Sequence, residues 1–534
     1  MGLFIYISKV NMSSKFAALI FSAILLAAAY LAPNLFPLAW LAFVPLFWVI
    51  DRAETLRRAV LYGWLMGTVA HLIGFHWLVY TISVFGGFPY PLSGLIFVFY
   101  AILQGLQMAI FAFLVRRLGF GPLQIFPAVF WISLEFWFPL LFPWYLANSQ
   151  VWFSWFIQTA DLVGPYGASF LLMWFNAALF KLACARQEKR GGRIPALAYP
   201  ALLALLSLVY GYQRLETVGE EMVRAPKLPV AVVQGNIDID LKWNPALVKQ
   251  NLEKHKSLTN QLEAVPLVIW PESAVEAWLP DDLQYLPEEL MPQFKSKQTH
   301  FIFGAKSFRG KPGTADFKAF NTAFFADATG RVLGRYHKQV LLAFGEYLPF
   351  SKVLALLPGM PLGDGFTAGS GPVAFQTPGG IRIGPLICYE DLMPDLSRKF
   401  VKETGANILV NLTNDAWYGK SVGPWQHARL AQSRAIETRR SLLRVTNTGV
   451  TSLVDARGKM VQSLPMFVPE MLKTEVDILE SQTYYVRFGD WFAWGMTIIT
   501  IALLVNVLRQ TSSLRRLDSS EISRLKMSRL NTVL

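Results

Sequence analysis

The chain has 534 residues, too many for one ordinary domain, so two or more domains are expected. Its residues are 53% hydrophobic and 14% aromatic, and the mean hydropathy is +0.36. These values exclude an ordinary soluble protein and are typical of one with several membrane spans. The formal charge of +13 would first indicate a nucleic-acid partner, but residues 214–487 hold 31 Lys and Arg against 28 Asp and Glu. The remaining basic surplus flanks apolar runs, so it indicates membrane topology and argues against nucleic acid as a partner.

Eight apolar runs are long enough to cross a bilayer, which predicts eight membrane spans. They lie near residues 15–32, 35–50, 60–82, 91–115, 121–142, 165–185, 195–212 and 491–508. The first run has an alternative interpretation as a cleaved signal peptide, because a basic flank precedes it and small residues occur at Ala27–Ala29. The second run follows it so closely that we favour a span.

Basic residues alternate sharply between the connecting loops. The connections after the second, fourth and sixth runs carry Lys or Arg, whereas those near 33–34, 83–90 and 143–164 carry none. The positive-inside rule therefore predicts cytoplasmic termini and an extracytoplasmic segment over 213–488. The expected organisation is a seven-helix membrane domain over 1–213, an extracytoplasmic domain over 214–487, an eighth span over 488–510 and a basic cytoplasmic tail over 511–534.

The long segment after the seventh run reads as a layered α/β domain. Short β-branched runs occur at 228–233, 267–270, 301–303, 323–325, 381–383 with 386–387, and 408–410. Helix-like stretches over 246–263 and 424–440 separate some of them, which favours alternating strands and helices. Residues 327–330 and 455–458 read as hairpin turns. The Gly/Pro-rich, apolar loop 343–372 is typical of a lid.

Three chemically distinct residues each follow a strand-like run in this domain. They are Glu272, Lys338 and Cys388. The only other cysteine is Cys184, so a structural disulfide framework is not expected. A carboxylate, an amine and a thiol at one sheet edge would provide a general base, an electrostatic stabiliser and a nucleophile.

The surrounding residues resemble the motifs of the nitrilase, or carbon–nitrogen hydrolase, superfamily. The matching segments are Trp270-Pro-Glu272-Ser, Tyr336-His-Lys338-Gln, Phe344-Gly-Glu346-Tyr-Leu-Pro349, Ile387-Cys388-Tyr-Glu390, Val233-Gln-Gly-Asn236 with Lys242-Trp243, and Asn411-Leu-Thr-Asn-Asp415-Ala-Trp417. With seven spans before the domain and one after, nearly the whole chain resembles the apolipoprotein N-acyltransferase family. The longer basic tail after Arg509 is the main departure.

This resemblance implies an αββα sandwich with a Glu272-Lys338-Cys388 triad. It implies a ping-pong reaction in which Cys388 takes an acyl chain from a membrane phospholipid as a thioester. The acyl chain then passes to the α-amino group of the N-terminal diacylglyceryl-cysteine of an apolipoprotein. The expected setting is the bacterial inner membrane with a periplasmic catalytic domain, in a monomer that needs no metal or cofactor.

The resemblance also implies roles for residues around the triad. Glu346 and Glu390 would fix Lys338 and tune Glu272, and the backbone N–H of Tyr389 would help to hold the oxyanion. Lys338 would favour the thiolate of the cysteine, while Glu272 would need a raised pKa to act as base. The residues expected to bind substrate are Trp243, Phe344, Tyr347, Pro349 and Trp417.

The same residues also allow three other functions. A Cys-His protease would use His337 or His427 as its catalytic base, but neither histidine is needed when a carboxylate base is available. A membrane-anchored amidase acting on a soluble amide is the main alternative, and the apolar loop 343–372 argues against it. A non-catalytic lipid-binding scaffold is disfavoured by the intact triad.

Overall fold

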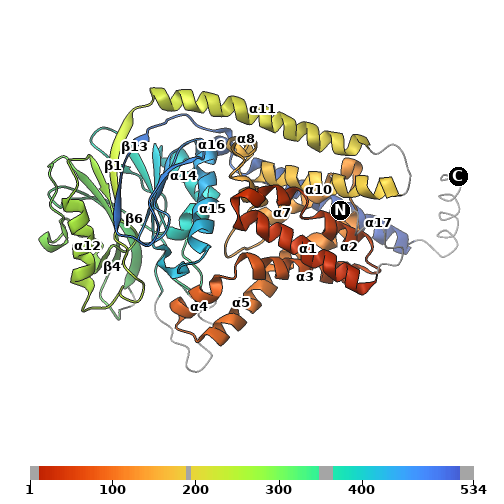
Figure 1. Ribbon diagram of the computed structural model, residues 1–534, viewed down its shortest axis with the longest axis horizontal. Helices are drawn as coiled ribbons and strands as arrows, with labels where there is room; N and C mark the ends of the chain where they lie inside the picture. The colour runs from red at the N-terminus through yellow and green to blue at the C-terminus, as the bar shows by residue number, and fades with distance from the viewer. Residues whose placement is uncertain (1–10, 188–193, 315, 348–364, 517–534) are drawn as a thin grey trace.

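The computed structural model describes residues 11–187, 194–314, 316–347 and 365–516. A helical half and an α/β half lie next to each other along the long axis of the molecule (Figure 1). The chain builds most of the helical half first and enters the α/β half through the long helix α11 (Ile194–Arg224). It then returns in α17 (Trp491–Arg516), which packs on α7 (Phe126–Trp137).

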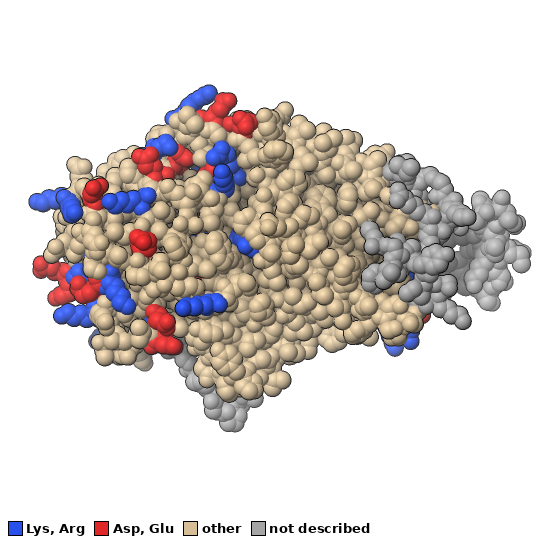
Figure 2. Space-filling model, viewed as in Figure 1, with Lys and Arg blue, Asp and Glu red and all other residues tan. Residues whose placement is uncertain are grey.

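The remaining long helices of the helical half are apolar and joined by short connections. They are α1 (Met12–Leu31), α2 (Val44–Asp51), α3 (Leu56–Gly74), α4 (Leu78–Gly86), α5 (Tyr90–Gln104), α6 (Leu106–Leu118) and α10 (Tyr166–Gln187), with the shorter η2 (Pro33–Trp40), η3 (Pro122–Gln124), η4 (Leu146–Gln150), α8 (Ser154–Ile157) and α9 (Ala160–Val163). On the face drawn in Figure 2, charged side chains gather over the α/β half, while the helical half shows very few. A surface of that kind suits hydrocarbon rather than water.

The described helices give fewer complete spans than the sequence predicts. Five stretches are long and apolar enough to cross a membrane, and the pair α3–α4, bent by 69°, would be a sixth. The run predicted near 121–142 contains α7, which has only 12 residues, whereas a span needs about 20. The predicted number of eight spans is therefore not confirmed.

The α/β half contains two sheets. The seven-stranded sheet has the order β13-β1-β2-β4-β5-β6, with β3 paired to β4, and the six-stranded sheet has the order β12-β11-β10-β9-β8-β7. The strands are β1 (Lys227–Gln234), β2 (Leu267–Ile269), β3 (Val275–Pro280), β4 (His300–Arg309), β5 (Lys318–Asp327), β6 (Val332–His337), β7 (Phe375–Gln376), β8 (Arg382–Ile387), β9 (Ile408–Thr413), β10 (Leu442–Thr446), β11 (Ser452–Val454), β12 (Met460–Ser463) and β13 (Glu470–Asp477). The helical elements are α12 (Val248–Asn260), η5 (Glu288–Leu290), η6 (Cys388–Leu392), α14 (Pro394–Thr404), η7 (Asp415–Tyr418), α15 (Gly423–Thr438) and α16 (Tyr484–Phe488).

Alternation along the strands produces the layers. In β1, Val230 and Val232 belong to the core between the sheets, whereas Ala231 and Val233 belong to the cluster under α12. This is the period of two that places successive side chains on opposite faces. Helices α14 and α15 cover the outer face of the other sheet. The layers are thus α12, sheet, sheet and α14–α15, which confirms the expected αββα sandwich.

All six predicted strands and both predicted helices of this half are present. The segment 327–330 joins the antiparallel strands β5 and β6, and 455–458 joins β11 and β12, as expected for hairpin turns. Strands β3, β7, β10 and β13 and helices α14 and α16 were not predicted. Residues 348–364, most of the expected lid, lie outside the described residues.

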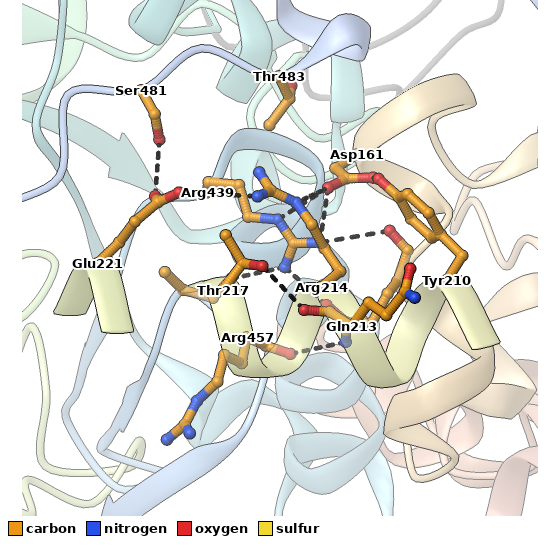
Figure 3. A network of polar contacts seen from close by, with 12 residues as sticks. Asp161, Tyr210, Gln213, Arg214, Thr217, Glu221, Arg439, Arg457, Ser481 and Thr483 are labelled. Carbon is orange, nitrogen blue, oxygen red and sulfur yellow. Dashed lines mark hydrogen bonds and ion pairs between the residues drawn. The ribbon is translucent and has the colours of Figure 1, made fainter. Parts of the chain in front are cut away.

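One buried carboxylate connects the two halves (Figure 3). Asp161 Oδ2 accepts from Arg439 Nη2 at 2.8 Å and from Arg214 Nε at 2.8 Å. Its other oxygen accepts from the hydroxyl of Tyr210 at 2.7 Å, and Arg439 also donates to Gln158 at 2.6 Å. Because a buried charge is stable only when paired and hydrogen-bonded, this cluster fixes α9, α11 and the end of α15 relative to one another.

Candidate active site

Cys388 lies at a sharp strand-to-helix turn at the end of β8. Its φ is +52°, a left-handed conformation that a residue with a side chain rarely adopts. Two side chains hold this conformation. Asn411 Nδ2 donates to the carbonyl oxygen of Cys388 at 2.8 Å, and Glu390 Oε2 accepts from the N–H of Ile387 at 2.8 Å. The sulfur therefore projects from a rigid turn.

Glu272 follows β2, on the neighbouring sheet. The backbone bends at Ser273, whose φ is +50°, and it passes directly over β4 at Gly304. A Cβ on Gly304 would lie 2.5 Å from the nitrogen of Ser273 and 2.7 Å from the Cα of Glu272, closer than atoms can approach. Glycine is therefore required at this position for the carboxylate to reach the site.

Lys338 lies between two carboxylates. Its Nζ is 2.7 Å from Glu346 Oε2 and 3.9 Å from Glu272 Oε1, and its side chain is only 2% exposed. The same two carboxylates share one amide, because Asn321 Nδ2 donates to Glu272 Oε1 at 2.8 Å and to Glu346 Oε1 at 2.9 Å. Sequence reasoning missed Asn321, which lies inside β5 with no motif around it.

The protonation states follow from burial and from these charges. Burial, reinforced by the charge of Glu346, raises the pKa of Glu272 against the opposing effects of Lys338, Asn321 and a hydrogen bond to Cys388. Burial and then the charge of Glu272 raise the pKa of the Cys388 thiol well above its ordinary value. Burial opposes the charge of Lys338, but Glu346, Cys388 and Glu272 outweigh it and raise the pKa of Lys338.

The resting site therefore holds a neutral thiol and an ammonium. The charge of Lys338 lowers the pKa of the Cys388 thiol, as expected, but burial raises that pKa by more. Lys338 therefore does not produce a thiolate in the resting site. The expected raised pKa of Glu272 is present. A base in contact with the thiol must then remove its proton during attack, and Glu272 is hydrogen-bonded to it.

The two supporting carboxylates differ in what they contact. Glu346 holds the ammonium directly, as expected. Glu390 instead accepts from the hydroxyl of Tyr336 at 2.9 Å and from the N–H groups of Gln339 at 2.6 Å and Val340 at 3.0 Å. Burial raises the pKa of Glu390 to about 7. Glu390 thus ties the segment after Lys338 to the Cys388 turn through backbone groups.

Tyr389 connects the nucleophile turn to the helical half. Its hydroxyl donates to the carbonyl of Leu141, and its ring centroid is 5.9 Å from that of Phe142. The aromatic segment after α7 therefore lies directly against the residue that follows Cys388.

Four of the five residues expected to bind substrate lie in the described part of the chain. Trp243 has a φ of +70°, and its N–H donates to Glu276 at 2.9 Å. The ring centroids of Trp417 and of Phe85 in α4 are 4.5 Å apart. The side chains of Phe344 and Tyr347 are 68% and 42% exposed, while Pro349 lies outside the described residues.

A buried ionic cluster lies behind the nucleophile. His427 Nδ1 is 2.9 Å from Asp415 Oδ1 and its Nε2 is 2.9 Å from Asp391 Oδ1, while Arg444 contacts both carboxylates. Thr413 is hydrogen-bonded to the Cys388 thiol and to Asp415 at 3.3 Å.

Neither of the two candidate histidine bases uses a ring nitrogen to contact the Cys388 thiol. Both ring nitrogens of His427 contact carboxylates. Those of His337 contact Asp281 at 3.0 Å and Thr322 at 3.0 Å. A Cys-His protease is therefore not supported.

Comparison with known families gives two matches along the chain. Residues 229–485 match the carbon-nitrogen hydrolase family, and residues 22–178 match the apolipoprotein N-acyltransferase N-terminal domain. Together they cover the α/β half and most of the helical half.

Curated relatives match over nearly their whole lengths. The chain is 34% identical to the apolipoprotein N-acyltransferase of Geobacter metallireducens, over 89% of this chain and 92% of that one. It is 32% identical to the enzyme of the same name in Azotobacter vinelandii, with 88% and 90% covered. Among solved structures, Nit3 of Saccharomyces cerevisiae, a member of the nitrilase superfamily, covers 47% of this chain and 90% of its own, at 20% identity and a TM-score of 0.35. The matches to the curated relatives show that this chain belongs to the apolipoprotein N-acyltransferase family.

Proposed function

We propose that the protein transfers an acyl chain from a membrane phospholipid, through a thioester on Cys388, to the α-amino group of the diacylglyceryl-cysteine that begins a lipoprotein. The carrying observation is one cluster at the end of the sandwich: the thiol is hydrogen-bonded to Glu272, and Lys338 lies 3.9 Å from the same carboxylate. Tyr389, the residue after Cys388, contacts Leu141 and Phe142 of the apolar helical half. Family membership supports the same activity.

In the first step the sulfur attacks the ester carbonyl of the phospholipid. Glu272 takes the thiol proton as the S–C bond forms. As the C–O bond breaks, Glu272 returns that proton to the glyceryl oxygen. The products are an acyl thioester on Cys388 and a lysophospholipid.

The negative charge on the carbonyl oxygen needs donors that are already in place. Lys338 is held by Glu346 at 2.7 Å, so it can face this charge without reorganisation. The N–H of Tyr389 is the second donor, because it follows Cys388 on the rigid turn. Removal of one such donor typically costs on the order of 100-fold in rate.

In the second step the amino group of the lipoprotein attacks the thioester. Glu272 takes a proton from the nitrogen as the N–C bond forms, and the proton goes to the sulfur as the C–S bond breaks. The amide product leaves, and the neutral thiol is restored. The high pKa of that thiol matches its return to the protonated form.

Competition from water would waste the thioester, so the site must favour an amine held in the membrane. The segment η7 meets α4 of the helical half, since Phe85 packs on Trp417 and Thr81 donates to the carbonyl of Trp417 at 3.0 Å. A lipid could therefore pass from the bilayer to the sulfur along apolar surface. This contact favours transfer between lipids over hydrolysis of a soluble amide.

The membrane arrangement is part of the proposal. We place the helical half in the bacterial inner membrane with eight spans, residues 214–487 in the periplasm and residues 511–534 in the cytoplasm, in a monomeric protein. The alternation of basic loops supports this orientation.

Mass spectrometry of the purified protein after incubation with phospholipid tests the function. An acyl mass on the Cys388 peptide, released by hydroxylamine, is expected in the wild type and in Lys318→Gln, an exposed control. Cys388→Ala should give no adduct, and Glu272→Gln and Lys338→Met should form it far more slowly. Release of ammonia from amides without any acyl adduct would indicate the amidase instead.

A further inference from the structure

Lys306 lies on β4 next to the triad but takes no part in the chemistry above. It is directly opposite Asn321 of β5, and opposed residues of an antiparallel pair project from the same face. That face also carries Gly304, which packs on the backbone of Glu272. Because Lys306 is two residues further along the strand, it lies roughly 7 Å beyond this contact.

The ammonium of Lys306 is held by aromatic rings. Its Nζ is 3.5 Å from the ring centroid of Trp243 and 5.4 Å from that of Trp278. Trp278 is opposite Lys306 on the paired strand β3 and is 47% exposed. Cation–π contacts of this kind fix the position of a cation but do not neutralise it.

Within the described ranges, the half-buried ammonium of Lys306 has no hydrogen bond or ion pair. The nearby acidic group is Glu276, and its oxygens already accept from Trp243 at 2.9 Å and from Asn251 at 3.1 Å. Glu276 also faces the ammonium of Lys242 at 3.7 Å. Burial lowers the pKa of Lys306, and Glu276 only partly opposes this effect.

A positioned cation without an anion, beside an ester-cleaving sulfur, indicates an anionic group in the ligand. In a glycerophospholipid the phosphorus is five or six bonds from the ester carbonyl, a span of roughly 6–8 Å. That span is similar to the rise of roughly 7 Å along β4 from Gly304, which packs on Glu272, to Lys306. Lysine commonly binds phosphate as a point charge.

We infer that Lys306, framed by Trp243 and Trp278, binds the phosphodiester of the acyl-donor phospholipid and so selects a phosphate-bearing donor. This inference rests on the proposed acyl transfer. The phosphate stays in place while the ester reacts, so the contact strengthens ground-state binding and transition-state binding alike. Loss of this contact should therefore raise KM and leave kcat nearly unchanged.

The test compares two donors that differ only in the phosphoglycerol head group. Full-length protein in mixed micelles is given either a phosphatidylglycerol or the 1,2-diacylglycerol with the same two acyl chains, and acylation of Cys388 is followed over time. The variants are Lys306→Gln and Lys306→Arg. Lys318→Gln, which removes an exposed lysine from the neighbouring strand, is the matched control.

In Lys306→Gln, the preference for phosphatidylglycerol over diacylglycerol, as a ratio of kcat/KM, should fall about tenfold or more. The loss should come from a raised KM, Lys306→Arg should recover most of the ratio, and Lys318→Gln should keep the wild-type ratio. Inorganic phosphate at millimolar concentration should not compete with the lipid.

An unchanged ratio in Lys306→Gln would overturn the inference, as would an equal loss with both donors, which indicates a structural role. Competition by inorganic phosphate alone would reassign the site to free phosphate. Acylation of wild-type Cys388 by phosphatidylglycerol tests the proposed function separately. If the wild type forms no adduct with either donor, the proposed function fails, whatever the variants do.

Discussion

The carboxylate of Glu346 controls how strongly Lys338 is drawn toward the base. At an effective dielectric constant of about 20, unit charges 2.7 Å apart attract by about 6 kcal/mol, and charges 3.9 Å apart by about 4 kcal/mol. In Glu346→Gln the ammonium loses the closer partner and is free to approach Glu272. The carboxylate of Glu272 then gains about 2 kcal/mol, which lowers its pKa by about 1.5 units.

Two consequences follow for the acylation step. The base must be ionised to accept the thiol proton, so the acidic limb of the pH–rate profile should move to lower pH by one unit or more. The maximal rate should fall by about 100-fold, because Lys338 is withdrawn from the developing oxyanion. Glu288→Gln, which changes an exposed carboxylate, is the control and should leave both quantities unchanged.

Single-turnover acylation of Cys388 between pH 4 and 9, followed by quenching and mass spectrometry, measures both quantities. A limb that stays in place or moves to higher pH in Glu346→Gln would refute this account of the site. It would show that Lys338 moves away from Glu272 when Glu346 is replaced, because losing the repulsion between the two carboxylates would by itself lower the pKa of Glu272.

Three further variants test other parts of the structure. Asn321→Leu removes a hydrogen bond that lowers the pKa of Glu272, so the acidic limb of the same profile should move to higher pH. His427 has a pKa of about 9 in the folded protein and about 6.5 in the unfolded chain. Its charge therefore stabilises the fold fully below pH 6.5. About 3 kcal/mol of unfolding free energy is lost as the pH rises to 9. Denaturant titrations at several pH values should therefore show a smaller decline over this range in His427→Gln than in the wild type. Asp161→Asn leaves Arg439 buried without a full counter-charge and should cost about 3–5 kcal/mol of unfolding free energy. The loss should be seen as a lower melting temperature in one detergent. An unchanged melting temperature would mean that Asp161 does not hold the halves together.

The sequence was sufficient to select Glu272, Lys338 and Cys388 as candidates for one site, because each follows a strand-like run. Glu272, Lys338 and Cys388 do lie at one end of the sandwich, and the β-branched run at 228–233 predicted strand β1. Asn321 could not be predicted, since its role depends on cross-strand register, which a single chain does not reveal. Strand β13 was missed because Glu470–Asp477 is rich in charged residues and has only one buried position.

The number of spans illustrates a second limit. The run near 60–82 reads as one apolar helix, yet it is broken between α3 and α4 by 69°. The break is stabilised by a tertiary contact, because Trp77 Nε1 donates to Gln426 of α15 at 2.7 Å. Hydropathy measures how apolar a segment is, and it carries no information about a partner almost 350 positions away.

The shared use of Asp161 also bears on how the enzyme can be produced for screening. A water-soluble fragment made of the α/β half alone would lack Asp161 and Gln158, so the guanidinium of Arg439 would lose its counter-ion. The same fragment would lose the Leu141 carbonyl that receives the Tyr389 hydroxyl. Inhibitor searches and biophysical work are therefore best carried out on the whole chain in nanodiscs or mild detergent.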